Sequence, residues 1–280
     1  MRRKAIRIIL RVILFVAAIY GVVVVLLYAF QTAMIFPAGR DIWRTPSDGP
    51  FTWPFEDVYL EVGPERTHGW FIPHPNPGGV VLFSHGNGGT IADRLEHFAM
   101  IRELGFSVFA YDYGGYGKST GEPSESRCYA DALAAWNYLT QSRKISPATI
   151  VLYGESLGGG VACELAMETQ PRALVLQNTF LSVVKRAKEV YPIIPVDRLL
   201  KHRFENDVKL PYIKVPVLII HSPDDTIIPF HHGVGLYELA REPKSFLELA
   251  GDHNECIYRS EQRFKDGLRE FLSSHPAPLQ

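Results

Sequence analysis

The sequence predicts an α/β fold in which helices cover both faces of a mostly parallel β-sheet. From residue 80 onward, short aliphatic runs alternate with longer amphipathic stretches, the pattern of parallel strands joined by crossover helices. The 280 residues, 46% of them hydrophobic, suffice for one large buried core. The sequence contains no internal repeat and no low-complexity tract. One globular domain therefore accounts for most of the chain.

The N-terminal segment differs from the rest in composition. Five basic residues lie within residues 1–11, and an uncharged apolar stretch follows over residues 12–30. A helix over that stretch is roughly 28 Å long, close to the hydrocarbon thickness of a bilayer. We therefore expect a transmembrane signal-anchor helix. The alternatives are a cleaved signal peptide and a buried amphipathic helix of the domain.

The charges flanking this stretch predict its orientation. The basic cluster precedes it, whereas only Arg40 and Arg44 follow shortly after. By the positive-inside rule, the N-terminus is cytosolic and the domain lies on the opposite side, which is periplasmic, lumenal or extracellular. Residues 31–54, rich in Pro, Gly and Trp, read as a connector, and residues 55–275 as the domain.

The overall charge and the cysteines exclude some classes of protein. With 29 basic and 30 acidic residues the net charge is -1, so the composition does not indicate a nucleic-acid surface. The three cysteines are scattered and odd in number, which argues against a disulfide framework. Neither observation determines the oligomeric state or the redox compartment.

The elements of the domain follow from the hydrophobic pattern. Two antiparallel strands over residues 57–62 and 68–72, separated by Gly63-Pro64-Glu65-Arg66, form a hairpin. Further strands are expected over residues 80–83, 107–111, 149–153, 173–177, 217–221 and 245–249. Helices are expected over residues 91–104, 124–141, 157–170, 233–240 and 261–273.

The segment 178–215 lies between two predicted strands and is too long for a plain loop. It contains the three prolines Pro192, Pro195 and Pro211. We expect it to form a small helical cap over the site. Its apolar residues, such as Phe180 and Leu199, are compatible with an acyl pocket and equally with packing inside the cap.

The segment Gly154-Glu155-Ser156-Leu157-Gly158 follows a predicted strand and matches the pattern G-x-S-x-G. This pattern places the serine on a tight strand-to-helix turn, where its hydroxyl is exposed as a nucleophile. Glycines are needed because a Cβ at either position would collide with neighbouring backbone. The following helix begins with its positive end at the serine, which favours a developing anion. Taken alone, the segment also fits an ordinary glycine-rich turn.

A serine hydroxyl is a poor nucleophile at neutral pH and needs a base oriented by a carboxylate. Asp224 and Asp225 follow the strand over residues 217–221, and His253 follows the strand over residues 245–249. Because active sites of open α/β sheets gather at the carboxyl ends of the strands, these groups are expected to meet Ser156. The residues alone leave the choice between the two acids open, and His253 could instead be a solvent-facing loop residue.

The loop His85-Gly86-Asn87-Gly88-Gly89 ends an early strand with little side-chain obstruction. We expect the backbone amides of Asn87 and Leu157 to form an oxyanion hole. The alternatives are a plain glycine-rich turn and a weak phosphate loop, but no Lys-Ser or Lys-Thr pair follows, which disfavours nucleotide binding. His85 is expected to brace the loop.

Together with the turn over residues 111–119, these ordered segments resemble the α/β-hydrolase superfamily. The resemblance is closest to its membrane-anchored serine hydrolases of the depalmitoylase-like, α/β-hydrolase-domain-containing branch, and it covers roughly residues 55–273. It implies the α/β-hydrolase fold, selects Asp225 as the acid, and makes the turn after Asp112 structural. The chain departs from that branch by Ser222 where glycine is usual, and by a hydrophobic anchor where thioesterase members often carry a lipidated, cysteine-rich N-terminus.

The expected activity is hydrolysis of carboxylic esters or thioesters, including lipid-like acyl substrates, through an acyl-enzyme on Ser156. His253 acts as base and then acid, and Asp225 holds its tautomer. No cofactor, metal or nucleic-acid partner is implied. Two alternatives remain: a peptide or amide hydrolase using the same triad, and a catalytically inactive, membrane-tethered binding protein.

Overall fold

The computed structural model describes residues 2–277, so Met1, the first residue of the predicted basic segment, lies outside it. Within this range an eight-stranded sheet has the order β1-β2-β4-β3-β5-β6-β7-β8. The pairs β1/β2 and β2/β4 are antiparallel and the remaining pairs are parallel. The strands are β1 (Glu56–Val62), β2 (Glu65–Ile72), β3 (Val80–Ser84), β4 (Ser107–Tyr111), β5 (Ile150–Glu155), β6 (Ala173–Gln177), β7 (Val217–His221) and β8 (Lys244–Glu248). The predicted fold class is confirmed, with β1 at the edge and β2 beside it.

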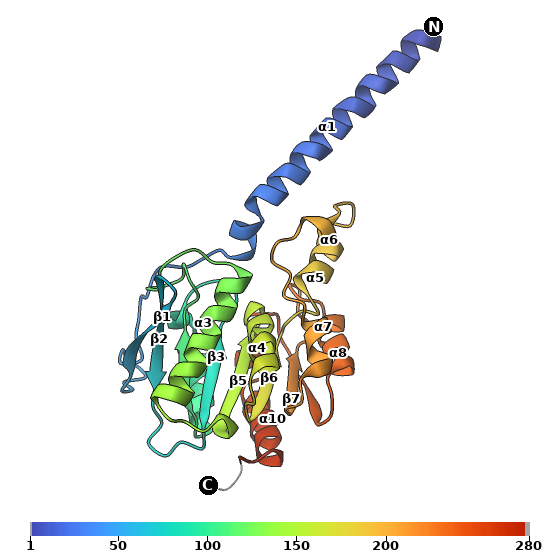
Figure 1. Ribbon diagram of the computed structural model, residues 1–280. Helices are drawn as coiled ribbons and strands as arrows, with labels where there is room; N and C mark the ends of the chain where they lie inside the picture. The colour runs from blue at the N-terminus through green and yellow to red at the C-terminus, as the bar shows by residue number, and fades with distance from the viewer. Residues whose placement is uncertain (1, 278–280) are drawn as a thin grey trace.

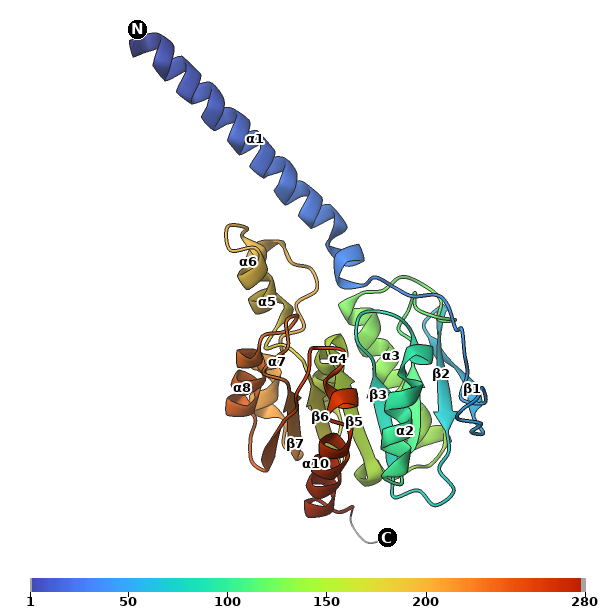
Figure 2. The ribbon, with the colours of Figure 1, turned by 180° about the vertical axis from the view of Figure 1, so that it is seen from behind.

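Helices cover both faces of the sheet (Figures 1 and 2). One face carries α3 (Glu125–Asn137), α4 (Leu157–Glu168) and α8 (Phe230–Leu239), and the other carries α2 (Leu95–Glu103) and α10 (Glu261–Ser274). Shorter helical segments are η1 (Ile91–Arg94), η2 (Tyr138–Ser142), η3 (Pro147–Thr149), η4 (Leu210–Tyr212) and α9 (Cys256–Arg259).

The sheet separates two hydrophobic cores. In β3, Val80 and Leu82 pack into the core beneath α3 and α4, whereas Val81 and Phe83 pack into the core beneath α2 and α10. Successive side chains of a strand point to opposite faces, and here both faces are buried. This explains why the central strands read as continuous apolar runs in the sequence.

The N-terminal helix α1 (Arg2–Ile35) projects away from the domain (Figure 1). It contains the predicted span 12–30 and continues to Ile35, so residues 31–35 of the predicted connector are helical. The helix is long and apolar enough to cross a membrane, and its most apolar stretch is not buried against the domain. A core helix would be covered by protein, so this exposure is consistent with a membrane anchor.

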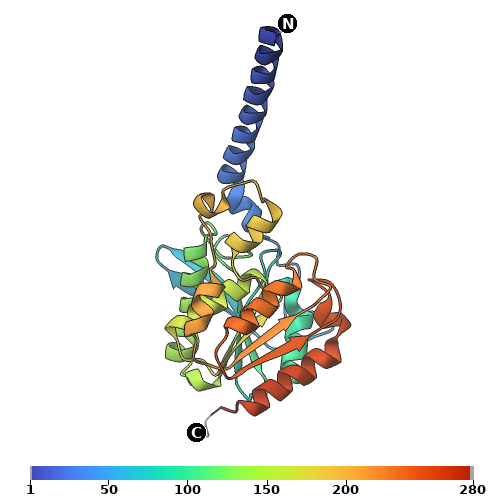
Figure 3. The same ribbon diagram turned by 90° about the vertical axis from the view of Figure 1, so that its right-hand side faces the viewer.

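The segment 178–215 contains α5 (Val183–Val190), α6 (Val196–Leu199) and α7 (Asn206–Lys209). Figure 3 shows α5 and α6, in yellow and orange, beside the lower part of α1. The two regions are joined by hydrogen bonds: the Gln31 side chain donates to the Leu199 carbonyl at 3.1 Å, and Thr32 Oγ1 lies 3.0 Å from His202 Nε2. The end of α1 and these short helices are therefore packed together.

Candidate active site

Ser156 lies on the tight turn between β5 and α4, as the G-x-S-x-G pattern predicts. Its backbone is in an unusual conformation, with φ 52° and ψ -115°. A positive φ in a residue other than glycine is strained and persists only when the surroundings enforce it. Here the Ser156 N–H donates to the Gln177 carbonyl at 2.9 Å, and its carbonyl accepts from Thr179 Oγ1 at 2.7 Å. A Cβ on Gly158 would lie 2.0 Å from the Ser84 carbonyl oxygen, which explains the glycine.

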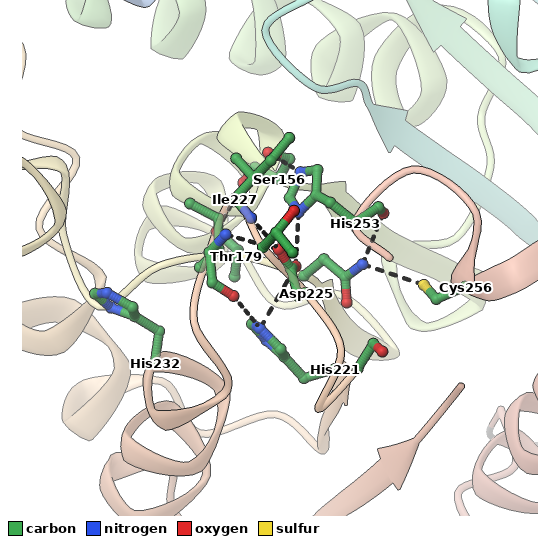
Figure 4. A network of polar contacts seen from close by, with 12 residues as sticks. Ser156, Thr179, His221, Asp225, Ile227, His232, His253 and Cys256 are labelled. Atoms are coloured by element: carbon green, nitrogen blue, oxygen red, sulfur yellow. Dashed lines mark hydrogen bonds and ion pairs between the residues drawn. The ribbon is translucent and has the colours of Figure 1, made fainter. Parts of the chain in front are cut away.

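His253 lies between Ser156 and Asp225 (Figure 4). Its Nε2 atom is 3.0 Å from Ser156 Oγ, and its Nδ1 atom is 2.6 Å from Asp225 Oδ2. All three side chains are buried. A carboxylate accepts the proton on Nδ1, which leaves Nε2 free to accept the serine proton. The structure therefore brings the three predicted residues together in the order that nucleophilic catalysis requires.

Asp225 is held by the turn that follows β7. Its Oδ1 atom accepts hydrogen bonds from the N–H groups of Ile227 and Ile228, at 2.9 and 2.7 Å. These bonds occupy one carboxylate oxygen and direct the other toward His253. The neighbouring Asp224 instead accepts from the Gly251 N–H at 3.3 Å. The two adjacent acids thus have different partners.

Asn178 positions the loop that carries His253, a role that sequence reasoning missed. Its side-chain amide donates to the His253 carbonyl at 2.8 Å and to Cys256 Sγ at 3.1 Å. Burial raises the pKa of the Cys256 thiol to about 11, so the thiol stays protonated at neutral pH. A protonated, buried thiol is consistent with a packing role for Cys256. A polar residue directly after a buried strand was the available signal for Asn178.

The loop that carries Asn87 is fixed by the turn after β4. The Tyr116 hydroxyl donates to the Asn87 carbonyl at 2.8 Å, and the Tyr113 hydroxyl donates to the His85 carbonyl at 2.7 Å. The His85 ring is buried against Tyr113, at 4.4 Å between ring centroids. Leu157 is the first residue of α4, so its N–H lacks an intrahelical acceptor. Asn87 and Leu157 both line a cavity that Ser156 also lines.

An ion pair beside the candidate nucleophile was not foreseen from the sequence. Arg94 Nε and Nη2 lie 3.1 and 3.2 Å from the two carboxylate oxygens of Glu155. Burial alone would raise the pKa of Glu155, but Arg94 outweighs burial and lowers it to about 2. A charged residue at the end of a buried strand indicates that a partner of opposite charge lies nearby. Which residue that is depends on the fold, because Arg94 lies 61 residues earlier in the chain.

Two cavities of opposite character meet at Ser156. A polar cavity of about 520 Å³ is lined by Glu155, Arg94 and Tyr258, among others. A mainly apolar cavity of about 270 Å³ lies toward α1 and α5. Residues common to both linings are Asn87, Ser156 and Ile227. The arrangement suits a substrate with one polar and one apolar part.

Among the described residues, Glu189, His231 and His232 form a group whose ligand atoms lie within 4.8 Å of one another. His232 Nδ1 accepts the Leu181 N–H at 3.1 Å, so the ring proton is on Nε2, which lies 3.2 Å from a Glu189 oxygen. A nitrogen that carries a proton cannot bind a metal ion. The group is therefore a hydrogen-bonded cluster that links the cap to α8.

Comparisons with known proteins identify relatives of this chain and of its fold. Residues 75–208 match the family model described as serine aminopeptidase, S33. An uncharacterized protein of Mycobacterium tuberculosis is 34% identical over 87% of this chain and 82% of its own length. Lysophosphatidylserine lipase ABHD12 of Danio rerio is 34% identical over 70% of this chain, and this chain covers 59% of that protein. A solved esterase from Pyrococcus furiosus, 18% identical, superposes with a TM-score of 0.71 over 85% of this chain and 97% of the esterase.

Proposed function

The chain belongs to the α/β-hydrolase superfamily of serine hydrolases, and from this we propose that it cleaves carboxylic esters or thioesters of acyl lipids through Ser156. The observation that carries the proposal is the position of His253, within hydrogen-bonding distance of both Ser156 and Asp225. Neither the serine nor the histidine needs to move for the first proton transfer.

In the proposed reaction, Ser156 Oγ attacks the acyl carbon while its proton passes to His253 Nε2. Asp225 stabilises the imidazolium that forms. The amides of Asn87 and Leu157 donate to the oxyanion, each contributing about 2.7 to 4 kcal/mol of transition-state stabilisation. His253 then returns the proton to the departing alcohol or thiol, which leaves an acyl group on Ser156. Water, deprotonated by His253, releases the acid and regenerates the hydroxyl.

The cavities support a lipid-like substrate. The apolar cavity suits an acyl chain and the polar cavity suits a head group, with Ser156 between them. ABHD12, which shares the domain, bears the name of a lysophosphatidylserine lipase, so a glycerophospholipid with an acyl ester is a reasonable first substrate to assay. We further propose that α1 anchors the enzyme with Lys4, Arg7 and Arg11 on the cytosolic side and the domain across the membrane.

A peptidase is the second candidate, because the matched family model is described as a serine aminopeptidase. The same triad would serve amide hydrolysis, and only the leaving-group contacts would differ. A carboxylate to bind a free substrate amine would have to come from the polar cavity. There Glu155 is paired with Arg94, and Asp93 accepts hydrogen bonds from Trp43 Nε1 at 2.9 Å and the Thr90 N–H at 2.7 Å. Both carboxylates therefore already have partners, which makes esters the better candidate.

The test is labelling with a fluorophosphonate in detergent, for the wild type and Ser156→Ala. We expect labelling that is lost in the variant, followed by turnover of acyl esters in preference to aminoacyl amides. Preferential turnover of amides would support the peptidase. Equal labelling of both proteins, or none in a folded wild type, would refute Ser156 as the nucleophile and support the binding-protein alternative.

A further inference from the structure

We propose that α1 and the cap together form a passage through which the acyl chain of a bilayer lipid reaches Ser156 sideways, an inference that rests on the hydrolase activity proposed above. In this proposal the membrane helix does more than tether the domain. Its last two turns form one wall of the acyl site, and α5 and α6 form the other.

The first observation is that two apolar cavities adjoin each other. A second apolar cavity, of about 100 Å³, lies between α1 and the cap. It shares lining residues with the apolar cavity that contains Ser156. The shared residues are Met34, Ile35, Val183, Ala187 and Tyr191. The two apolar cavities therefore adjoin each other, with these side chains between them, and together they extend from the side of α1 to the candidate nucleophile.

The second observation is the face that α1 presents to this path. Leu27, Tyr28, Gln31, Met34 and Ile35 line it, at spacings of three and four residues that place them on one side of a helix. The one side-chain amide among these residues, that of Gln31, already has hydrogen-bond partners in the protein. The Gln31 side chain accepts from the Lys201 N–H at 2.7 Å and donates to the Leu199 carbonyl at 3.1 Å. The wall offered to a ligand is therefore apolar.

The third observation is the tip of the cap, residues 190–196, which carries no charge between Glu189 and Asp197. Ile193 is 75% exposed and Val190 is 49% exposed. The Tyr20 hydroxyl donates to the Ile193 carbonyl at 2.7 Å, although Tyr20 lies about 20 Å along the helix axis from Ile35. With residues 12–30 in the hydrocarbon, the tip lies at membrane depth and its exposed side chains contact lipid. An acyl chain can then enter the passage without crossing water.

The polar cavity on the other side of Ser156 determines how the proposed substrate is oriented in the site. Arg94, Gln177 and Asn254 are among its lining residues, and it lies away from α1. A lipid bound with its acyl chain along α1 would place its ester at Ser156 and its head group in this cavity. One bound lipid would thus occupy the two apolar cavities with its acyl chain and the polar cavity with its head group.

A direct test uses the wild-type protein in detergent and a long-chain alkyl fluorophosphonate that carries a diazirine at the chain end. After labelling and irradiation, mass spectrometry locates the crosslink. We expect crosslinked peptides from residues 27–35 or 190–200. Crosslinks confined to other parts of the domain would overturn the passage while leaving the nucleophile assignment intact.

A second test compares Ala187→Trp with Lys188→Trp, using p-nitrophenyl esters from acetate to palmitate. Ala187 lines both apolar cavities, whereas the Lys188 side chain is half exposed on the same helix. We expect Ala187→Trp to lower the palmitate rate roughly tenfold or more relative to acetate, because the indole fills the path. The control should keep the wild-type profile.

Fluorophosphonate labelling of each variant shows whether it is folded. If Ala187→Trp does not fold, the crosslinking experiment on the wild type still tests the passage. An unchanged chain-length profile in a labelled Ala187→Trp variant would overturn the passage alone. Failure of the wild type to label or to hydrolyse any ester would overturn the proposed function, and the passage with it.

Discussion

Asp225 directs one carboxylate oxygen at His253 Nδ1, 2.6 Å away, while the carboxylate of Asp224 beside it accepts from the Gly251 N–H at 3.3 Å. Adjacent acids on one turn therefore have separate environments. The difference arises because the N–H groups of Ile227 and Ile228 hold Asp225 in place. This pair offers a matched test of the acid in the proposed triad.

We predict that Asp225→Asn lowers kcat roughly 10⁴-fold, because an amide cannot accept the Nδ1 proton in the same way and favours the wrong histidine tautomer. Asp224→Asn should keep activity near the wild-type level. The measurement is steady-state turnover of a short-chain ester by both variants. Similar losses in the two variants would contradict the assignment of Asp225.

Gly154 tests the steric basis of the nucleophile turn. A Cβ there would lie 2.5 Å from the Gly158 carbonyl oxygen and from the Gly159 Cα. Backbone atoms cannot move aside cheaply, so Gly154→Ala should destabilise the fold by about 1 to 3 kcal/mol. Gly78→Ala, whose nearest contact is 3.6 Å, is the control. The measurement is the midpoint of thermal unfolding. Equal midpoints for the two variants would contradict the prediction.

His97 should make stability depend on pH. Burial lowers its pKa from the ordinary 6.5 to about 4, and its Nε2 lies 3.1 Å from the Tyr153 hydroxyl. Between these values the unfolded chain binds a proton that the folded chain excludes. The free energy of unfolding is therefore highest above pH 6.5 and decreases as the pH falls toward 4. The decrease due to His97 is about 2 kcal/mol by pH 5.

We therefore expect His97→Gln to lose less stability than the wild type between pH 7 and pH 5. Denaturant unfolding at the two pH values measures this difference. Equal losses in both proteins would mean that His97 does not titrate in this range.

Phe36, directly after α1, should anchor the connector to the domain. It is buried against His202 and Phe204, with ring centroids 5.0 and 6.1 Å away. Phe36→Ala should cost about 3 to 5 kcal/mol, with the melting temperature falling roughly 2 to 4 °C for each kcal/mol. Phe30→Ala, at an exposed position of α1, should leave the unfolding of the domain unchanged. An equal melting temperature for both variants would contradict the role of Phe36.

Strand positions were predictable because apolar runs and their boundaries are local features. The runs at residues 107–111, 173–177 and 217–221 coincide with β4, β6 and β7. Helix ends were less accurate: α8 begins at Phe230 rather than at residue 233, because Pro229 starts it and the first turn carries two histidines. The helix predicted over residues 124–141 is α-helical only as far as Asn137, and a π-helical turn follows over Tyr138–Ser142.

The sequence by itself determined the fold class, through the alternation of apolar runs and amphipathic stretches, and the turn that carries Ser156, through glycines directly after a recognisable strand. It also placed an acid and His253 after later strands, but the residues alone left Asp224 and Asp225 open, and the resemblance to the α/β-hydrolases selected Asp225. Only the tertiary structure decided that Arg94 pairs with Glu155 and that Met34 lies in the same cavity as Ser156. Such contacts join residues far apart in the chain. They depend on how helices and strands pack together, which no local period or motif specifies.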